Sequence, residues 1–409
     1  MDAGVPLVPE VGVLALVPDT WGGPWQPRHH VLTRLAHTFP VVWMNPAPYW
    51  RSLLPGAPSD DWDFEFDGVT PPGFRTYTPA VWLPEIYRPP IVARWMRRER
   101  LRRALRLLAR QGCKKTVLYL WRPEHARALD LVGHDLSCYH IDDEYTFSPV
   151  EQPQSAAEAA LIRRVDQVFI HSPGLLDKKG HLNLHTGFVP NGVDYRAYTT
   201  PRPEPPDLAA IPHPRVGYVG LIKPQLDVPL LHRLAGEHRG WSFVLVGPLP
   251  DKEPLASQVR EIGRLPNVHL LGPKPVSALP AYVQHLDVCL LCYVVDDYTK
   301  YIYPMKLHEY LATGRPVVGS RIRSLQEFAE VVSLARTPAE WSGAIASALE
   351  PAAQAPARVE ARRAVAQAHD WDRIATEIAG TIAERLGPAY RERLELVRPP
   401  HVPSTAFRQ

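Results

Sequence analysis

Short runs of aliphatic and β-branched residues alternate with stretches of helical periodicity along most of the chain, and this alternation restricts the possible folds most strongly. Several runs are hydrophobic without interruption, which is typical of strands covered on both faces of a sheet. Strands separated by helices indicate βαβ units and therefore parallel sheets in an α/β fold. The predicted strands are residues 11–17, 39–44, 116–121, 136–142, 166–171, 215–220, 242–247, 267–271, 287–293, 315–319 and 331–334.

A proline-rich segment at 196–214 divides these strands into two groups. It holds six prolines in its last fourteen residues, a composition that is typical of a semi-rigid linker. We therefore expect two Rossmann-like domains of similar size, one on each side of this segment. Residues 1–195 would form the first domain and 215–370 the second. A helix at 371–387 would pack back toward the first domain, and 388–409 would form a loosely ordered tail.

The composition excludes several classes of protein. With 409 residues, 45% hydrophobic and 22% charged residues, and a formal net charge of +3, the chain suits a globular protein and no nucleic-acid partner is expected. No apolar run approaches the ~20 residues of a membrane-spanning helix, and 11–17 is interpreted as a buried strand and not as a signal peptide. Cys289 and Cys292 form a CxxC within a predicted strand, where residues three apart point to opposite faces. We expect buried thiols and no zinc site, because no second cysteine pair is present.

The segment 301–320, YIYPMKLHEYLATGRPVVGS, combines the start of a helix with two charged side chains. Pro304 suits the first turn and Gly314 suits the end of this helix. Lys306 would add a positive charge to a helix N-terminus that already attracts anions. Glu309, one turn deeper, could accept two hydrogen bonds from a ribose diol, so the pair suits a nucleoside diphosphate. The alternative is an ordinary surface Lys and Glu at favourable helical spacing.

The stretch PMKLHEYLATGRPVV at 304–318 resembles the nucleotide-binding helix of the GT-B glycosyltransferases, in the group 1 or family 4 branch with the pattern Pro-x-Lys-x-x-Glu-Tyr-Leu-Ala. Weaker likenesses occur in the same order as in that family and extend the resemblance over about residues 130–320. They are CYHIDDEYTF at 138–147, SPGLL at 172–176, VPNGVD at 189–194, RVGYVGLI at 215–222 and NVHLLGPKPVSALPAYVQHLDVCLLCY at 267–293.

The resemblance implies an α/β fold of GT-B architecture, two Rossmann-like domains facing each other across a cleft, and specific roles on the donor side of that cleft. Glu309 would bind the ribose hydroxyls of a nucleotide sugar. Lys306 and the helix N-terminus would hold the diphosphate, and Gly220 would let the backbone approach a phosphate. The other residues assigned to the donor site are Lys223, Lys274, Tyr301 and Pro304.

Three positions depart from the family pattern and leave the donor sugar open. Tyr301 stands where many members carry a glutamate that touches the donor sugar. Leu221 and Leu226 stand where many members carry an arginine and a lysine, and only Lys223 lies nearby in the sequence. We therefore expect Lys306 to carry more of the phosphate charge than in better-known members.

No metal ion and no cofactor beyond the nucleotide-sugar co-substrate is expected. A leaving diphosphate must be stabilised while negative charge develops on it, and a helix dipole with a lysine can supply that stabilisation. Asp296 and Asp297 are adjacent and could suggest a metal site, but we interpret them as part of a solvated loop.

Two loops of the first domain follow strand ends, which is where ligands bind in open α/β sheets. In the loop at 18–30 the glycines give backbone freedom and the tryptophans could stack on a sugar or a lipid. In HIDDEY at 140–145, Asp142 or Asp143 could accept the proton of an acceptor hydroxyl as the catalytic base, although Asp143 could equally cap a helix. The residues assigned to the acceptor side are Trp21, Gly22, Gly23, His29 and His30, and the histidines could equally be polar surface residues.

The segment 88–115 holds eleven Arg or Lys residues and one Glu. Apolar residues recur in it at helical spacing, so we expect a helix with an apolar stripe on the sheet and a basic outer face. The basic face at 94–115 is either simply solvated or makes peripheral contact with an anionic membrane. The apolar residues expected to face the sheet are Ile91, Trp95, Leu101, Leu105 and Leu108.

Together these features predict a cytoplasmic, metal-independent glycosyltransferase. It would move a sugar from a nucleoside-diphosphate sugar to a cell-envelope glycan or a lipid-linked acceptor. The resemblance favours a hexosyl donor and retention of the anomeric configuration. The alternatives are a sugar-nucleotide epimerase of the same fold and a catalytically silent subunit that only binds the donor.

Overall fold

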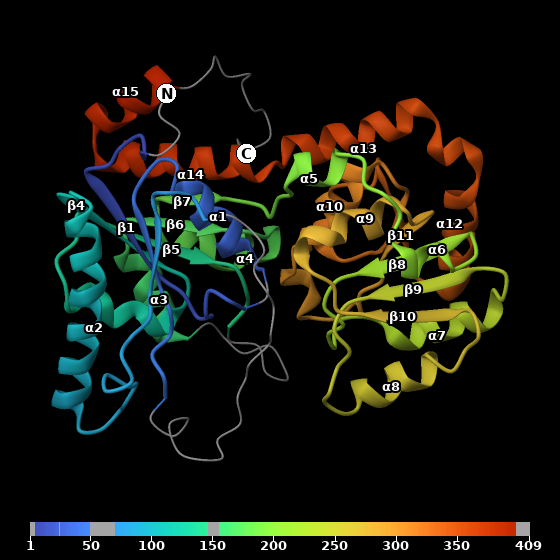
Figure 1. The fold of residues 1–409 in the computed structure, drawn as a ribbon, viewed down its shortest axis with the longest axis horizontal. Helices are drawn as coiled ribbons and strands as arrows, with labels where there is room; N and C mark the ends of the chain where they lie inside the picture. Colours follow the sequence, from blue (N-terminus) through green and yellow to red (C-terminus); the bar gives the residue numbers. More distant parts are fainter. Residues whose placement is uncertain (1–4, 24, 50–69, 146–154, 398–409) are drawn as a thin grey trace.

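The computed structural model describes residues 5–23, 25–49, 70–145 and 155–397, which form two α/β domains (Figure 1). Each domain contains one parallel sheet with buried helices packed on both of its faces. Residues of both domains line the cleft between them. The predicted GT-B architecture, two Rossmann-like domains that face each other across a cleft, is therefore confirmed.

The first sheet has seven parallel strands in the order β3-β2-β1-β4-β5-β6-β7. All five predicted strands of this region are present, and the central ones are buried along their whole length. β3 and β7 were not predicted, because one is an edge strand with two exposed polar residues and the other has only three residues. The strands are β1 (Val11–Leu16), β2 (Val41–Met44), β3 (Phe74–Tyr77), β4 (Lys115–Leu120), β5 (Leu136–Ile141), β6 (Gln167–Ile170) and β7 (Thr186–Phe188).

The second sheet has six parallel strands in the order β10-β9-β8-β11-β12-β13. All six were predicted, because their β-branched runs are bounded by glycine, proline or charged residues. In both sheets the strand order reverses beside the first strand of the domain, and such a switch point opens a crevice at the carboxyl ends of the strands. The strands are β8 (Arg215–Val219), β9 (Ser242–Val246), β10 (Val268–Gly272), β11 (Val288–Leu291), β12 (Val317–Ser320) and β13 (Val332–Ala335).

Helices cover both faces of each sheet. α1 and α14 pack on one face of the first sheet, and α2, α3 and α4 pack on the other. α10 and α9 pack on one face of the second sheet, and α7, α8 and α12 on the other. The helices are α1 (Pro27–Leu35), α2 (Pro90–Arg110), α3 (Ala156–Arg164), α4 (Pro173–Lys179), α5 (Tyr195–Thr199), α6 (Pro206–Ala209), α7 (Val228–Glu237), α8 (Leu255–Ile262), α9 (Leu279–Gln284), α10 (Met305–Thr313), α11 (Arg323–Gln326), α12 (Pro338–Leu349), α13 (Pro356–Ala368), α14 (Trp371–Leu386) and α15 (Pro388–Val397).

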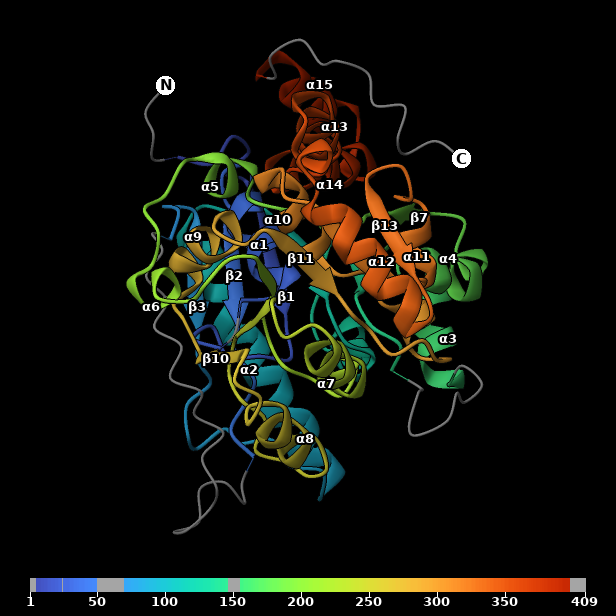
Figure 2. The ribbon, with the colours of Figure 1, turned by 90° about the vertical axis from the view of Figure 1, so that its right-hand side faces the viewer.

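The C-terminal end of the chain returns to the first domain. α13 lies over the second domain and α14 over the first, along the same side of the molecule (Figures 1 and 2). Asp370 caps α14 by accepting a hydrogen bond from the backbone N–H of Asp372, and Trp371 and Ile378 join the first domain's core. The expected loose tail is wrong for residues 388–397, which form α15, while 398–409 lie outside the described residues.

The proline-rich segment at 196–214 packs onto the second domain over much of its length. It contains most of α5 and all of α6. Tyr198, Leu208 and Ile211 are buried in the second domain's core. Residues of this segment are therefore held at fixed positions beside the cleft.

The predicted burial of the two CxxC thiols on opposite faces of their strand is confirmed. Cys289 and Cys292 are both buried, and each belongs to a different core cluster on one of the two faces of the second sheet. Burial raises the pKa of both thiols, that of Cys289 to about 12, so they stay protonated. Within the described ranges there is no group of three or more His, Cys, Asp and Glu side chains arranged to hold a metal ion.

The expected apolar stripe of the basic helix is only partly correct. In α2, Leu101 and Leu108 are buried against the first sheet, and Leu105 is partly buried there. Ile91 and Trp95 are instead 84% and 56% exposed. At about 100° per residue, Ile91 and Trp95 lie on the other side of α2 from the buried residues Ala93, Ala104 and Leu108, so they do not continue the stripe. None of the helices that the structure describes combines the length and hydropathy needed to cross a membrane.

Candidate active site

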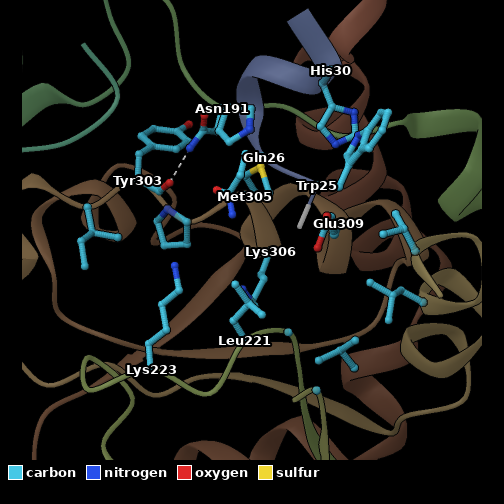
Figure 3. A pocket seen from close by; sticks show the side chains of 18 of the residues that line it. Trp25, Gln26, His30, Asn191, Leu221, Lys223, Tyr303, Met305, Lys306 and Glu309 are labelled. Carbon is cyan, nitrogen blue, oxygen red and sulfur yellow. Dashed lines mark hydrogen bonds between the residues drawn. The ribbon is translucent and has the colours of Figure 1, made fainter. Parts of the chain in front are cut away.

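A cleft of about 730 Å³ lies at the carboxyl ends of the strands of both sheets. Figure 3 shows Lys306 and Glu309 in its centre, with Leu221 and Lys223 on one side and Trp25 and His30 on the other. Lys306, Glu309, Leu221 and Lys223 belong to the second domain, and Trp25 and His30 to the first. A molecule in this cleft would therefore touch both domains.

The first turn of α10 forms one wall of the cleft. Pro304 is the N-cap of this helix, one residue before the position expected, and Gly314 ends it in the left-handed conformation with φ of 78°. Lys306 lies in the first turn, and its Nζ is 5.3 Å from the centroid of the Tyr218 ring. The helix N-terminus and the ammonium group thus bring positive charge to one point of the cleft.

Gly220, directly after β8, makes this position of Lys306 possible. A Cβ added to Gly220 would lie 1.9 Å from Cε and 2.5 Å from Nζ of Lys306. The φ of Gly220 is 142°, a backbone conformation that L-residues with a side chain rarely adopt. The missing side chain therefore leaves space for the lysine, a contact that the sequence did not indicate.

Glu309 lies one turn beyond Lys306 and faces the same cleft. The Tyr198 hydroxyl donates a hydrogen bond to its carboxylate. Burial raises the pKa of Glu309 above its ordinary value, although the charge of Lys306 and the Tyr198 bond oppose this shift. The carboxylate is therefore partly desolvated and held in place by a residue from the proline-rich segment.

Lys223 lies on the loop after β8 and lines the cleft opposite the start of α10. Burial lowers its pKa, and the positive charge of Lys306 lowers it further. Two ammonium groups in one cleft repel each other, and an anion bound between them would offset this repulsion. The pair therefore favours binding of a polyanion. Leu221 and Leu226 also line the cleft, where they add apolar surface and no charge.

Two other predicted donor residues have different surroundings. Lys274 lines the cleft, but its Nζ is 2.7 Å from Oδ2 of Asp207, which neutralises its charge. The Tyr301 ring is buried with core residues of the first domain, and Lys178 Nζ lies 5.1 Å from its centroid. Tyr301 therefore joins the two domains beside the cleft, where its buried ring gives little surface to a donor sugar.

In the first domain, Asp142 is part of a buried ion network and has little freedom to act as a base. Arg28 donates from Nη1 to Oδ2 of Asp142 at 2.5 Å and also forms an ion pair with Asp19. The Tyr145 hydroxyl donates to Oδ1 of Asp142 at 2.5 Å. Burial raises the pKa of Asp142, but Arg28, Arg122 and the Tyr145 bond outweigh burial and leave the pKa below its ordinary value. Arg28 was not predicted, because its partner Asp142 lies 114 residues away in the sequence.

Asp143 accepts a hydrogen bond that crosses the cleft. The Tyr298 hydroxyl, from the second domain, donates to Oδ1 of Asp143 at 2.8 Å, and the backbone N–H of Glu144 donates to the same oxygen. Burial and the charge of Asp143 raise the pKa of Tyr298, so this hydroxyl stays protonated and can donate. Asn191 makes a second contact between the domains, from its Nδ2 to the carbonyl of Tyr303 at 2.7 Å (Figure 3).

The structure corrects part of the predicted acceptor side. Trp21 packs with Trp43 and Phe74 in the core, and His29 is fully buried in the same aromatic cluster. His29 Nδ1 accepts a hydrogen bond from the backbone N–H of Gln26, and burial lowers the pKa of His29 to about 3. Both side chains point inward because they fill the core beneath α1, which their position in a loop did not reveal.

Other residues of the same loop do reach the cleft. Gly23 and His30 line it, as does Trp25, which was not assigned to the site, whereas Gly22 is exposed and does not line it. The His30 ring stacks on Trp371 of α14 with centroids 5.0 Å apart. Burial and the charge of Arg34 lower the pKa of His30 well below its ordinary value, so it is neutral at physiological pH.

The adjacent aspartates at 296 and 297 stabilise a turn. Asp296 Oδ1 accepts hydrogen bonds from the backbone N–H groups of Tyr298 and Thr299 at 3.0 and 2.8 Å. Asp297 Oδ1 lies 3.7 Å from Nζ of Lys300. Asp296 therefore holds the loop that carries Tyr298 to the cleft.

Comparison with known proteins identifies a domain in the second half of the chain. Residues 213–351 match the family model described as "Glycosyl transferases group 1". TuaH of Bacillus subtilis strain 168, named as a candidate teichuronic acid biosynthesis glycosyltransferase, is 33% identical over 178 residues. That match covers 41% of this chain and 44% of the relative, so the chain corresponds to less than half of TuaH's length.

Solved structures with the same fold extend over most of the chain. The structure of the Anabaena protein HepE in complex with UDP and glucose matches with a TM-score of 0.66 at 17% identity. The match covers 91% of this chain and 99% of the HepE chain. Sucrose-phosphate synthase from Thermosynechococcus elongatus has a TM-score of 0.65 at 18% identity and covers 92% and 99%. At these identities the likeness concerns the arrangement of the two domains.

Proposed function

We propose that this chain, a GT-B protein with a group 1 glycosyltransferase domain at residues 213–351, transfers a sugar from a nucleoside-diphosphate sugar to an acceptor of the cell envelope. The acceptor would be a glycan or a lipid-linked saccharide, which agrees with the name of the TuaH relative. The reaction would take place in the cytoplasm or at the inner face of the membrane. The observation that carries the proposal is the position of Lys306 over Gly220, one turn before Glu309.

The second-domain wall matches the parts of a nucleoside diphosphate. Negative charge builds on the diphosphate as the bond to the sugar breaks, and fixed positive groups stabilise that charge best in a partly desolvated site. Lys306, Lys223 and the N-terminus of α10 would meet the phosphates. Glu309, held by Tyr198, would accept hydrogen bonds from the ribose hydroxyls. We propose that these groups act without a metal ion.

The first-domain wall would bind the acceptor. Asp142 accepts from Arg28 on one oxygen and from Tyr145 on the other, so we assign it a positioning role. Asp143 is the better candidate to face the acceptor hydroxyl, because its hydrogen bonds from Tyr298 and Glu144 both end on Oδ1. We also propose a hexosyl donor and retention of the anomeric configuration, for which a strong base is not required.

A matched pair of glycine variants tests the donor site. Gly220→Ala would displace the end of the Lys306 side chain, and the lost hydrogen bond between a charged lysine and a phosphate is worth about 1.5–3 kcal/mol. UDP affinity measured by calorimetry should therefore fall about 10- to 150-fold. Gly236→Ala is the control, because a Cβ there meets nothing within 4 Å. Equal UDP affinity in both variants would exclude Gly220 and Lys306 from the site.

A nucleotide screen tests the function itself. Thermal shifts with UDP, GDP, ADP and TDP would identify the base, and UDP is tried first because HepE was solved with it. Slow hydrolysis of the matching sugar nucleotide, unaffected by a chelator, is the expected result. A new sugar nucleotide formed without acceptor would indicate an epimerase. Nucleotide binding without any turnover would indicate a silent donor-binding subunit.

A further inference from the structure

The outer side of the first domain carries an exposed apolar patch at the start of α2 and in the segment before it. Thirteen large hydrophobic side chains are exposed among the described residues, and six of them lie between residues 81 and 95. Single exposed apolar residues are common, but a group of this size marks an interaction site. The patch consists of Val81, Trp82, Tyr87, Ile91, Val92 and Trp95.

Uncompensated positive charge borders this patch. Residues 81–110 contain nine arginines and two glutamates. Glu85 is already paired with Arg97 and Arg100, and Glu99 with Arg103 and Arg106. The remaining exposed arginines therefore keep their full charge at the surface.

Three of these arginines form a stripe beside the apolar residues. Arg94, Arg98 and Arg102 are exposed, and none has an acidic partner in the part of the chain that the structure describes. They lie four residues apart and so share one side of α2. Ile91 precedes Arg94 by three residues, which makes the two neighbours on the helix surface. On α2, apolar and cationic side chains thus share one side of the helix.

The position of α2 places this surface at the same edge of the first sheet as the cleft. Leu108, near the C-terminal end of α2, lies beside Gly12 at the start of β1, and α2 runs antiparallel to the strands because it connects two parallel ones. The N-terminal turns of α2, with Ile91 and Trp95, therefore lie toward the carboxyl ends of the strands. Asp142 and Asp143 directly follow β5, at the carboxyl edge of the same sheet. Figure 1 shows α2 on the side of the first domain that faces away from the second.

We propose that this surface, the six apolar residues with Arg94, Arg98 and Arg102, docks the protein on an anionic membrane. Trp and Tyr side chains favour the membrane–water interface, and arginines beside them attract anionic headgroups. Charge complementarity favours a lipid surface over a second copy of this chain, because two copies would bring identical arginine stripes together. The apolar residues enter only the interface, so binding is peripheral and reversible. The surface would hold the cleft close to acceptors that reside in the membrane.

Flotation with vesicles tests the proposal. The full chain should bind vesicles of phosphatidylcholine and phosphatidylglycerol at 50 mM NaCl, and bind much less to pure phosphatidylcholine or at 500 mM NaCl. Each arginine is worth roughly a fivefold change in affinity. The triple variant Arg94→Glu, Arg98→Glu, Arg102→Glu should therefore lose binding at least a hundredfold. The control variant Arg239→Glu, Arg264→Glu, Arg358→Glu changes the net charge equally on exposed sites of the second domain and should bind at least tenfold better than the first.

A second pair of variants tests the apolar part. Ile91→Ser with Trp95→Ser should weaken vesicle binding at least tenfold, whereas Leu184→Ser with Leu396→Ser, at sites 98% and 86% exposed, should not. The proposal is overturned if the wild type does not bind anionic vesicles at 50 mM NaCl, or if either test variant binds as well as its control. It is also overturned if sedimentation velocity shows a dimer that the Ile91 and Trp95 changes abolish. UDP binding, measured in parallel, reports on the donor site and can fail or persist independently of vesicle binding.

Discussion

The two walls of the cleft are built in different ways. On the second-domain wall, Lys306 and Glu309 lie within one turn of a single helix, and Gly220 completes their surroundings. On the first-domain wall, Arg28 joins Asp142, which is 114 residues away in the sequence. Groups that share one helix keep their relative positions wherever the helix packs, whereas an ion pair over such a distance exists only after the whole domain has folded. The first-domain wall is therefore the part whose integrity depends most on tertiary structure.

The largest expected effect comes from breaking the Arg28 network. Arg28→Ala leaves the Asp142 carboxylate buried and without its ionic partner, and removal of one member of such a pair costs about 3–5 kcal/mol. The free energy of unfolding, measured with urea, should fall by that amount. Arg373→Ala removes an ion pair between adjacent turns of a helix and should cost no more than about 1 kcal/mol.

The double variant Arg28→Met, Asp142→Leu sharpens this test. It removes both charges, so most of the lost stability should return. A loss below about 1 kcal/mol for Arg28→Ala would show that the first wall does not depend on this network.

Lys306→Ala probes the second wall, where we expect function to suffer more than stability. Hydrogen bonds to charged groups are worth about 1.5–3 kcal/mol, so UDP affinity should fall roughly 10- to 150-fold. Uridine affinity should stay within about twofold, because the lysine is assigned to the phosphates. Turnover should fall further than UDP affinity, since the charge on the diphosphate develops in the transition state.

Lys274→Ala is the matched control for Lys306. It removes a lysine of the same cleft whose charge Asp207 already neutralises, so UDP affinity should change less than about threefold. If the two lysine variants lost the same affinity, or if uridine binding fell as much as UDP binding, Lys306 would have only a structural role.

Glu309→Gln and a pH series test the ribose contact. The amide keeps the shape of the side chain but loses charge-assisted hydrogen bonds, so uridine affinity should fall at least about tenfold. Burial raises the pKa of Glu309 above 4.5. Protonation therefore begins at a higher pH than for an ordinary glutamate, and uridine affinity of the wild type should decline as the pH falls through that raised value. The Gln variant should show no such decline, and a parallel pH profile in both proteins would remove Glu309 from the site.

The smallest effect is expected where the two walls meet. Tyr298→Phe removes the hydrogen bond to Asp143 that crosses the cleft, and a bond of this kind is worth about 0.5–1.5 kcal/mol. The rate of donor hydrolysis should change about two- to tenfold. UDP affinity should stay within about twofold, because Tyr298 is not assigned to the nucleotide. An equal change in both quantities would place Tyr298 in the donor site.

Local patterns in the sequence determined much of the fold and the position of two candidate donor-site residues. The alternation of buried strands and helices predicted both sheets, and the motif at 304–318 lies within the residues that match the group 1 glycosyltransferase model. Lys306 and Glu309 were correctly predicted to lie side by side, because helical geometry places residues three apart on one face, and both line the cleft. Cys289 and Cys292 were correctly predicted to lie on opposite faces of the sheet, because residues three apart on a strand point in opposite directions.

Only the tertiary structure decided the surroundings of these groups. The Lys306 side chain fills the space beside Gly220, and Tyr198 lies against the Glu309 carboxylate. Lys274 forms an ion pair with Asp207. These contacts join segments that lie far apart in the chain, and no local spacing encodes them. Burial depends in the same way on what packs against a side chain. His29 lies in a core that its own loop does not reveal, whereas the apolar Ile91 lies on the solvent side of α2, away from the buried Ala93 and Leu108.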